Sequence, residues 1–268
     1  MPTYPDLLFD ADDGVVTLTL NRAEQRNAFS GAMATSLAAA YRDCDQRDDV
    51  RAVVLTGAGA AFCVGADMAA GAATFAQRDE PEFSADPIAF PAWRVRKPVI
   101  AAINGHAVGI GLTIAMQCDI RLVAREAKLA FAHVRRGVVP DAHAHWTVPR
   151  AIGFARTAEL FLTGRHVGGE EAAAIGLVSR ALPAADVLAA AQAMAREIAT
   201  QCAPLSVALS KQLLWESRGL SRDEVGARET ALHHVVMGRP DALEGVMSFL
   251  ERRPPRWALR VPRDWPDD

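Results

Sequence analysis

Hydrophobic runs and polar breaks alternate along the first two thirds of the chain and predict a succession of strands, turns and helices. Apolar runs rich in β-branched residues occupy residues 15–20, 52–56 and 99–103. Runs of this length between turn residues are typical of buried strands. Asp12-Asp13-Gly14, just before the first run, is a hairpin turn signal. Shorter strands are predicted at residues 122–124, 128–131 and 177–179.

Helical patterns fill the remaining segments and most of the last third. Ser30 is a candidate N-cap for a helix that ends near Asp43, and another helix is expected from about Trp146. From Ala184 onward the pattern is helical except in residues 252–268, where Pro and Arg dominate. Residues 71–91 lose periodicity and gather Gly, Asp, Glu and Pro, which predicts a mobile exposed loop. The order of elements predicts an α/β fold with a helical carboxyl-terminal region.

Two segments share the design of strand, tight loop and helix. In one, the strand at residues 99–103 leads through Gly109-Ile110-Gly111 into an apolar helix; in the other, residues 62–68 form a loop predicted to feed a helix. The first N–H groups of a helix have no intrahelical partner and lie at the positive end of its dipole. Two helix entries that converge on one oxygen would form an oxyanion hole, with Ile110 N–H as one donor. Small residues at such turns also serve close backbone packing alone.

The glycines after the strand at residues 99–103 do not fit a nucleotide site. Gly109-x-Gly111 follows a strand, but the third position of the dinucleotide fingerprint is Ile114, and no acidic residue ends a second strand about 20 residues on. The phosphate-binding pattern G-x-x-x-x-G-K-[ST] is also absent from the sequence. We therefore discount both nucleotide-binding folds.

Composition narrows the function classes. The 268 residues are half apolar with a net charge of -3, enough for one large domain or a domain with an appendage, and unlike a nucleic-acid binder that works through bulk charge. Four cysteines at Cys44, Cys63, Cys118 and Cys202 form no close pair, as expected in a reducing compartment. The amino terminus is acidic, and no apolar run reaches membrane-spanning length. A cytoplasmic protein without membrane or nucleic-acid partners is expected.

Several ordered motifs together carry a resemblance to a known family. They are Asn21-Arg22-x-x-x-x-Asn27-Ala28, Ala61-Phe62-Cys63-x-Gly65-Ala66-Asp67, the run from Lys97-Pro98 through Asn104-Gly105-x-Ala107-x-Gly109, Cys118-Asp119-Ile120 and Leu162-Thr163-Gly164-Arg165. In order and spacing they resemble the enoyl-CoA hydratase/isomerase (crotonase) superfamily, over nearly the whole chain.

The resemblance implies a crotonase (ClpP-like) spiral of β-β-α units at residues 1–200 and a helical trimerisation region at residues 201–268. It implies a homotrimer or hexamer and an acyl-CoA thioester substrate, with coenzyme A as part of that substrate and no further cofactor. The two oxyanion donors of the family fall on the N–H groups of Ala66 and Ile110. The family usually has glycine at the second position, and Ile110 departs from that.

The resemblance also implies contacts to coenzyme A. Arg26 and Ala28, Ala66 and Asp67, and Arg252 fall at positions where relatives bind it or order its loop. Arginine suits phosphate through its planar fork of donors, although surface arginines usually have no such role.

The two glutamates with which family hydratases activate water fall on Thr113 and His133, so both acids are missing. Asp141 falls where several relatives carry a working aspartate, and a single carboxylate there could move a proton between two carbons while Ala66 and Ile110 hold the enolate oxygen. His133 could assist as a proton relay near neutral pH. This predicts an enoyl-CoA isomerase with Asp141 as base. If the resemblance is set aside, the position of Asp141 between Pro140 and a predicted helix favours a role as a helix N-cap.

Other interpretations stay open. One is a hydratase whose water is held by Asp141 and a histidine, and another is a protein that binds acyl-CoA without turnover. A zinc site at Asp141-x-His143-x-His145 is disfavoured, because residues two apart diverge on a helix and no further ligand completes the set. Residues 71–91 are expected to form part of the acyl pocket.

Overall fold

The chain begins with a hairpin. The computed structural model describes residues 3–76 and 84–266. Strand β1 (Leu7–Asp12) pairs antiparallel with β2 (Val15–Leu20), and the register runs from Leu7 opposite Leu20 to Asp12 opposite Val15. Asp13 and Gly14 both have positive φ, 44° and 80°, as a two-residue turn of this kind requires. The predicted hairpin turn is confirmed.

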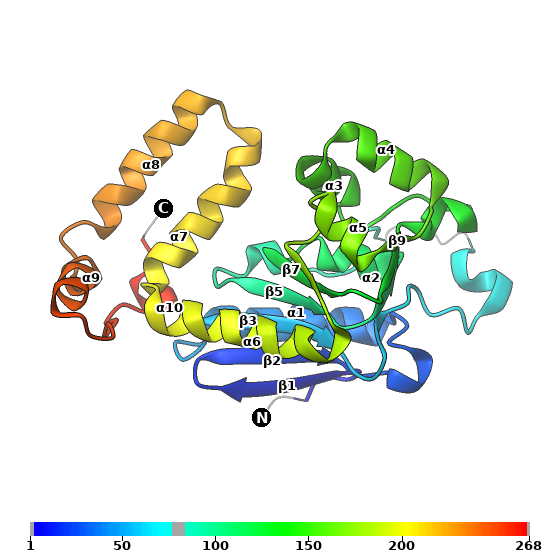
Figure 1. Ribbon diagram of the computed structural model, residues 1–268, viewed down its shortest axis with the longest axis horizontal. Helices are drawn as coiled ribbons and strands as arrows, with labels where there is room; N and C mark the ends of the chain where they lie inside the picture. Colours follow the sequence, from blue (N-terminus) through cyan, green and yellow to red (C-terminus); the bar gives the residue numbers. More distant parts are fainter. Residues whose placement is uncertain (1–2, 77–83, 267–268) are drawn as a thin grey trace.

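The hairpin opens a six-stranded sheet in the order β1-β2-β3-β5-β7-β10 (Figure 1). Its other strands are β3 (Ala52–Gly57), β5 (Val99–Ile103), β7 (Ile120–Ala124) and β10 (Arg180–Leu182), all paired in parallel. Every residue of β3 and β5 is buried, which explains their continuous apolar runs.

The last strand lies three residues later than the sequence suggested. Leu177 and Val178 donate their N–H groups to the carbonyl of Ala172 and so close the end of the preceding helix. Only from Ser179, whose N–H donates to Arg121 O, does the chain join the sheet. Apolar residues at 177 and 178 therefore pack at a turn and do not form the strand.

A second, four-stranded sheet has the order β4-β6-β8-β9. Its strands are β4 (Ala61–Cys63), β6 (His106–Val108), β8 (Lys128–Ala130) and β9 (Val167–Gly168). Each of the first three follows a strand of the large sheet, so strand-strand units repeat along the chain. Strands β4 and β6 pair in parallel, with Cys63 opposite Ala107, and this pairing brings the two loops that follow them side by side.

Helices cover these sheets. They are α1 (Gly31–Gln46), α2 (Ile110–Ala115), α3 (Ala144–Ile152), α4 (Phe154–Thr163), α5 (Gly169–Ala174) and α6 (Ala184–Gln201). The predicted cap of α1 is confirmed, since Ser30 accepts a hydrogen bond of 3.0 Å from Met33 N. Helix α6 packs across β2, β3, β5 and β7 (Figure 1), and α2 is buried at all six positions.

Short 3₁₀ helices occupy several connections. They are η1 (Ala23–Gln25), η2 (Gly71–Phe75), η3 (Ala92–Arg94), η4 (Ala132–Arg136) and η5 (Ser217–Gly219). The loop predicted at residues 71–91 thus begins with a helical turn at Gly71–Phe75. Residues 77–83 of that loop lie outside the described residues.

The carboxyl-terminal helices α7 (Pro204–Glu216), α8 (Arg222–Val236) and α9 (Pro240–Glu251) project away from the sheets, and the short α10 (Val261–Asp264) lies against α7 (Figure 1). Helix α10 is a turn of helix inside residues 252–268, for which none was predicted. Lys211 ties α7 to the core through Asp119, at 2.7 Å. Among the described helices, none is both long and apolar enough to span a bilayer.

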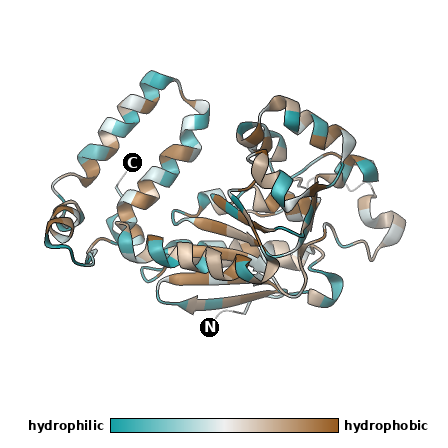
Figure 2. Cartoon of the chain, viewed as in Figure 1, coloured by the Kyte–Doolittle hydropathy of each residue, from teal (hydrophilic) through white to brown (hydrophobic). Residues whose placement is uncertain are grey.

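These projecting helices leave large apolar side chains in solvent. Figure 2 shows hydrophobic residues on the turns of α7 to α9 as well as in the central strands. The exposed side chains include Leu214, Met237, Leu243, Val246, Phe249 and Leu250. The internal core of this region is small, built on Leu205, Leu209 and Leu259. The burial of the chain is therefore concentrated around the two sheets.

Candidate active site

The loop after β4 turns its backbone around Ala66. Phe29 N–H donates to Gly65 O at 2.8 Å and Asp67 N–H donates to Phe29 O at 3.0 Å, which makes a parallel bridge between Phe29 and Ala66. In such a bridge the N–H of the middle residue points away from the partner strand. Ala66 N–H accordingly has no acceptor among the described residues.

This loop does not feed an α-helix, and the prediction of a helix entry at residues 62–68 is wrong. Asp67 Oδ1 accepts the N–H of Ala69 at 2.9 Å, and its Oδ2 accepts Arg22 at 2.7 Å. The Ala69 N–H, followed by Arg22, lowers the pKa of the Asp67 carboxyl below its ordinary value. These side-chain contacts offer the backbone a turn in place of a helix, and helical structure begins only at Gly71.

The second loop does enter an α-helix. Gly109 has φ 56° and ψ -130°, a conformation that residues with a side chain rarely adopt. It turns the chain sharply from β6 into α2. Ile110 is the first residue of α2, so its N–H has no partner within the helix, and none elsewhere among the described residues.

The two loops meet at their glycines. A methyl group built on Gly109 would lie 3.8 Å from Gly65 Cα and 3.8 Å from His133 Nε2, and one on Gly65 would lie 3.2 Å from Val108 O. The corner that precedes Ala66 therefore lies against the corner that precedes Ile110, with the His133 ring beside both. That the two N–H groups share one oxygen stays a prediction.

Three polar side chains converge beside these loops. Thr113 Oγ1 donates to Asp141 Oδ1 at 2.6 Å, and His133 Nε2 lies 3.4 Å from the same oxygen. Thr113 is fully buried, and the side chain of His133 is 6% exposed against 25% for Asp141. The residues at the two positions of the missing glutamates thus both contact the carboxylate that sequence reasoning singled out.

The capping role for Asp141 is wrong. Helix α3 begins at Ala144 with His143 as its N-cap residue, and no side chain caps it. Ala142 and His143 have φ of 48° and 59°, and this left-handed pair separates Asp141 from the helix. Its carboxylate is therefore free to face Thr113 and His133.

The neighbouring histidines point elsewhere. His143 Nε2 contacts Asp86 Oδ2 at 2.9 Å, and the ring of His145 packs edge-on against Phe161, 5.1 Å between centroids. The described residues contain no group of three His, Cys, Asp or Glu side chains that could hold a metal ion.

Comparison with known proteins finds relatives over nearly the whole chain. The sequence profile described as enoyl-CoA hydratase/isomerase matches residues 10–260. The chain belongs to the enoyl-CoA hydratase/isomerase family. A probable enoyl-CoA hydratase/isomerase from Mycobacterium abscessus has a crystal structure that superposes with a TM-score of 0.92 at 50% identity, covering 94% of this chain and 98% of that one.

Curated relatives extend along almost the full length. A probable enoyl-CoA hydratase of Mycobacterium tuberculosis is 35% identical over 263 residues, 96% of this chain and all of the relative. An enoyl-CoA hydratase of Alternaria alternata is 36% identical over 247 residues, 91% of this chain and 83% of the relative. The crotonase fold and the superfamily predicted from the sequence motifs are confirmed.

The residues expected to contact coenzyme A lie in two separate places in the structure. Arg26 is exposed beside the first loop, and its carbonyl accepts Val64 N–H at 3.3 Å. The carbonyl of Ala28 accepts Arg22 Nη1 at 2.6 Å. Arg252, by contrast, ends α9 at the opposite end of the molecule from α2 (Figure 1). Within one chain, Arg252 does not join the other residues.

Arg22 is the residue that sequence reasoning missed. It contacts both Ala28 O and Asp67, and so connects the two segments around the first loop. The signal was present, because Arg22 is the second residue of the Asn21-Arg22 motif.

Cys63 is excluded as a nucleophile, since burial raises the pKa of its thiol to about 12.

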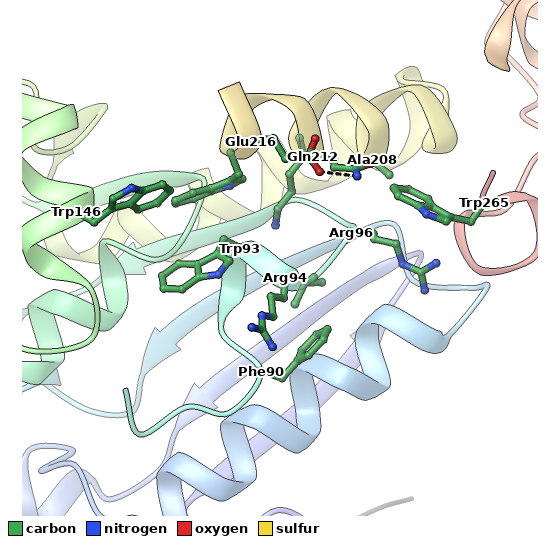
Figure 3. Close-up of a pocket in the computed structure, with 12 residues that line it drawn as sticks. Phe90, Trp93, Arg94, Arg96, Trp146, Ala208, Gln212, Glu216 and Trp265 are labelled. Carbon is green, nitrogen blue, oxygen red and sulfur yellow. Dashed lines mark hydrogen bonds between the residues drawn. The ribbon is translucent and has the colours of Figure 1, made fainter. Parts of the chain in front are cut away.

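The family member also has an aromatic pocket away from this cluster. It measures about 470 Å³, and its lining includes Phe90, Trp93, Trp146 and Trp215. Figure 3 shows Phe90, Trp93 and Trp146 among the side chains that line it. None of Thr113, His133 or Asp141 lines the pocket. The polar cluster, which has both unpaired backbone donors beside it, is the better candidate for chemistry.

Proposed function

We propose that this protein isomerises the double bond of enoyl-CoA thioesters, with Asp141 as the base. The observation that carries the proposal is the contact of Thr113 and His133 with one oxygen of Asp141. Neither partner is an acid, so Asp141 is the one carboxylate of this cluster. It stands beside two corners whose N–H groups are unpaired within the described residues.

The proposed reaction needs a single proton carrier. The Asp141 carboxylate removes a proton from C2 of a 3-enoyl thioester. The electron pair of that C–H bond forms a C1=C2 double bond, conjugated with C3=C4, while the carbonyl π pair moves onto the thioester oxygen. The N–H groups of Ala66 and Ile110 stabilise that dienolate oxygen. The carboxylic acid then returns the proton at C4, which gives the 2-enoyl thioester and restores the carboxylate. Ile110 suits this role although relatives have glycine there, because only its N–H is needed.

Binding of the coenzyme A part is proposed at Arg26, Ala28 and Asp67, which border the first loop. Arg252 fits this role only between copies, because it lies far from the loop of its own chain. We therefore propose a homotrimer or hexamer in which α9 of one copy approaches the site of another. No further cofactor and a cytoplasmic location are part of the same proposal.

Deuterium transfer tests the role of Asp141. With a 3-enoyl-CoA deuterated at C2, the wild type is expected to form the 2-enoyl product with deuterium carried to C4. Asp141→Asn should lower that rate by roughly 10²- to 10⁴-fold, the usual contribution of one acid–base group. Asp49→Asn is the matched control, since Asp49 is exposed and pairs with Arg47 outside the cluster. An Asp141→Asn enzyme that isomerises at the wild-type rate would remove Asp141 as base.

A second candidate is hydration, and one observation favours it. His133 and Asp141 form a pair of titratable groups 3.4 Å apart, which could hold and activate a water molecule, and the relatives are named hydratases. Release of 3-hydroxyacyl-CoA from a 2-enoyl-CoA, lost in His133→Gln, would establish this reaction. Tight acyl-CoA binding without either product, across a panel of enoyl chains, would instead indicate a binding protein.

A further inference from the structure

We propose that Thr113 is a positioning residue that holds Asp141 by one oxygen and leaves the other free to act as the base. This inference rests on the proposed role of Asp141. It assigns a function to a side chain that has none in the reaction as described above.

The hydrogen bond between Thr113 and Asp141 is short, and the helix that carries Thr113 is buried. Thr113 lies in α2, which is buried at every position, and its Oγ1 is 2.6 Å from Asp141 Oδ1. The same hydroxyl lies 3.2 Å from the carbonyl of Ile110. A hydroxyl has one proton, and the shorter distance and the negative charge both favour donation to Asp141. The helix that presents the Ile110 N–H therefore also orients the carboxylate.

The two oxygens of Asp141 are unequal. Oδ1 faces both Thr113 and His133 Nε2, whereas Oδ2 receives no hydrogen bond from the described part of the chain. The side chain of Asp141 is 25% exposed, so its free oxygen can reach a substrate. A turn of the carboxylate plane would move the free oxygen away from its present direction, and the Thr113 hydrogen bond opposes that turn.

The residue type at position 113 fits this role. A glutamate, which family hydratases have at this position, would bring a second negative charge against Asp141, and two carboxylates in contact cannot both stay ionised. Threonine supplies a neutral donor instead. His133 acts in the same direction, because its ring also replaces an acid.

Two substitutions separate positioning from packing. Thr113→Val keeps the shape and removes the hydroxyl, while Thr113→Ser keeps the hydroxyl and removes a methyl group. We expect Thr113→Val to lower kcat for isomerisation roughly 10- to 100-fold, the factor that matches a lost hydrogen bond to a charged group, with KM within about twofold. Thr113→Ser should recover most of kcat. Equal losses in both variants, or a wild-type kcat in Thr113→Val, would overturn the inference.

Crystal structures of both variants read the position of Asp141 without relying on turnover. We expect Asp141 to keep its orientation in Thr113→Ser and to rotate in Thr113→Val. An unchanged carboxylate in Thr113→Val contradicts the positioning role even in an active enzyme. Failure of the proposed function appears separately, as an Asp141→Asn enzyme that still transfers deuterium.

Discussion

Single residues in this protein carry tasks that their sequence neighbourhood does not reveal. Asp141 lies after a proline and before a helix, and its surroundings in the sequence indicate a cap. Its partner Thr113 is 28 residues away, and the pairing of β6 with β8 brings the two segments together. Family motifs identified the position of Asp141, but the hydrogen bond that orients it could not be predicted from spacing.

Lys97 is a buried charged residue that stabilises the end of a helix. It is 1% exposed, and its Nζ donates to the carbonyls of Cys44 at 2.8 Å and Arg47 at 3.0 Å, at the end of α1. A cation suits a helix carboxyl terminus. Burial is the main cause that lowers the pKa of Lys97 from its ordinary 10.5 to about 8, against the opposing pull of Asp45.

This shift predicts a pH dependence of stability. Because the folded pKa lies below the unfolded one, the contribution of this shift is fully present above about pH 10.5 and is lost as the pH falls through about 8. The free energy of unfolding of the wild type minus that of Lys97→Met should therefore increase by roughly 2 kcal/mol between about pH 7.5 and about pH 9.5. Urea unfolding at both pH values measures it. A difference that stays constant or shrinks contradicts the assignment.

At the scale of elements, the site depends on how closely α2 approaches β4. A methyl group built on Gly111 would lie 2.2 Å from Cys63 O, closer than real atoms come, so only glycine allows this contact. The helix and strand hold the two loops at a fixed separation. The small residue at the start of α2 thus allows close backbone packing, which was one of the two interpretations of the sequence. The loop geometry follows from that packing.

Gly111→Ala is therefore expected to destabilise the protein and to lower activity together. The free energy of unfolding should fall by roughly 3 kcal/mol, because backbone atoms must move. Gly226→Ala is the control: Gly226 is exposed in α8 with no atom near the added methyl group. That substitution should raise stability by about 0.5 to 1 kcal/mol. Urea unfolding of both variants is the measurement, and a neutral Gly111→Ala would show that α2 can shift freely.

The sequence predicts helices and strands correctly where burial of an element leaves a hydrophobic pattern in its residues. Strands β3 and β5 are buried on both faces, and their apolar runs predicted them to within one residue. Strand β6 has only three residues and no period of its own, so it was missed. The helix expected after Ala66 failed because the Asp67 side chain binds the backbone of Ala69, a contact that competes with helix formation.

At the scale of the whole molecule, the carboxyl-terminal helices indicate association. Helix α9 exposes Leu243, Val246, Phe249 and Leu250, with Phe249 81% exposed. Apolar patches of this kind mark contact surfaces in soluble proteins. The hydrophobic pattern of the sequence predicts these helices but cannot show which of their faces lies outside the chain's own core. The three-dimensional arrangement supplies that information.

Paired charges on this surface should separate the copies. Wild type is expected to sediment as a trimer or hexamer of the 28.7 kDa chain, and Val246→Glu with Phe249→Glu as a monomer. Leu8→Glu, on an exposed position of β1, is the control that should leave the assembly intact. Sedimentation velocity distinguishes the species. A wild type that sediments as a monomer would contradict the proposed association.

One pair of variants shows whether the Ile110 N–H stabilises a developing oxyanion. Proline is favoured at the first position of a helix, where its missing N–H costs no intrahelical bond, and Ile110 occupies that position in α2. Ile110→Pro removes the donor and keeps the helix, whereas Ile110→Ala removes the side chain and keeps the donor. Steady-state isomerisation of a 3-enoyl-CoA should lose roughly 10²- to 10³-fold in kcat in Ile110→Pro and little in Ile110→Ala. Equal activity of the two variants, both folded by circular dichroism, would contradict the account.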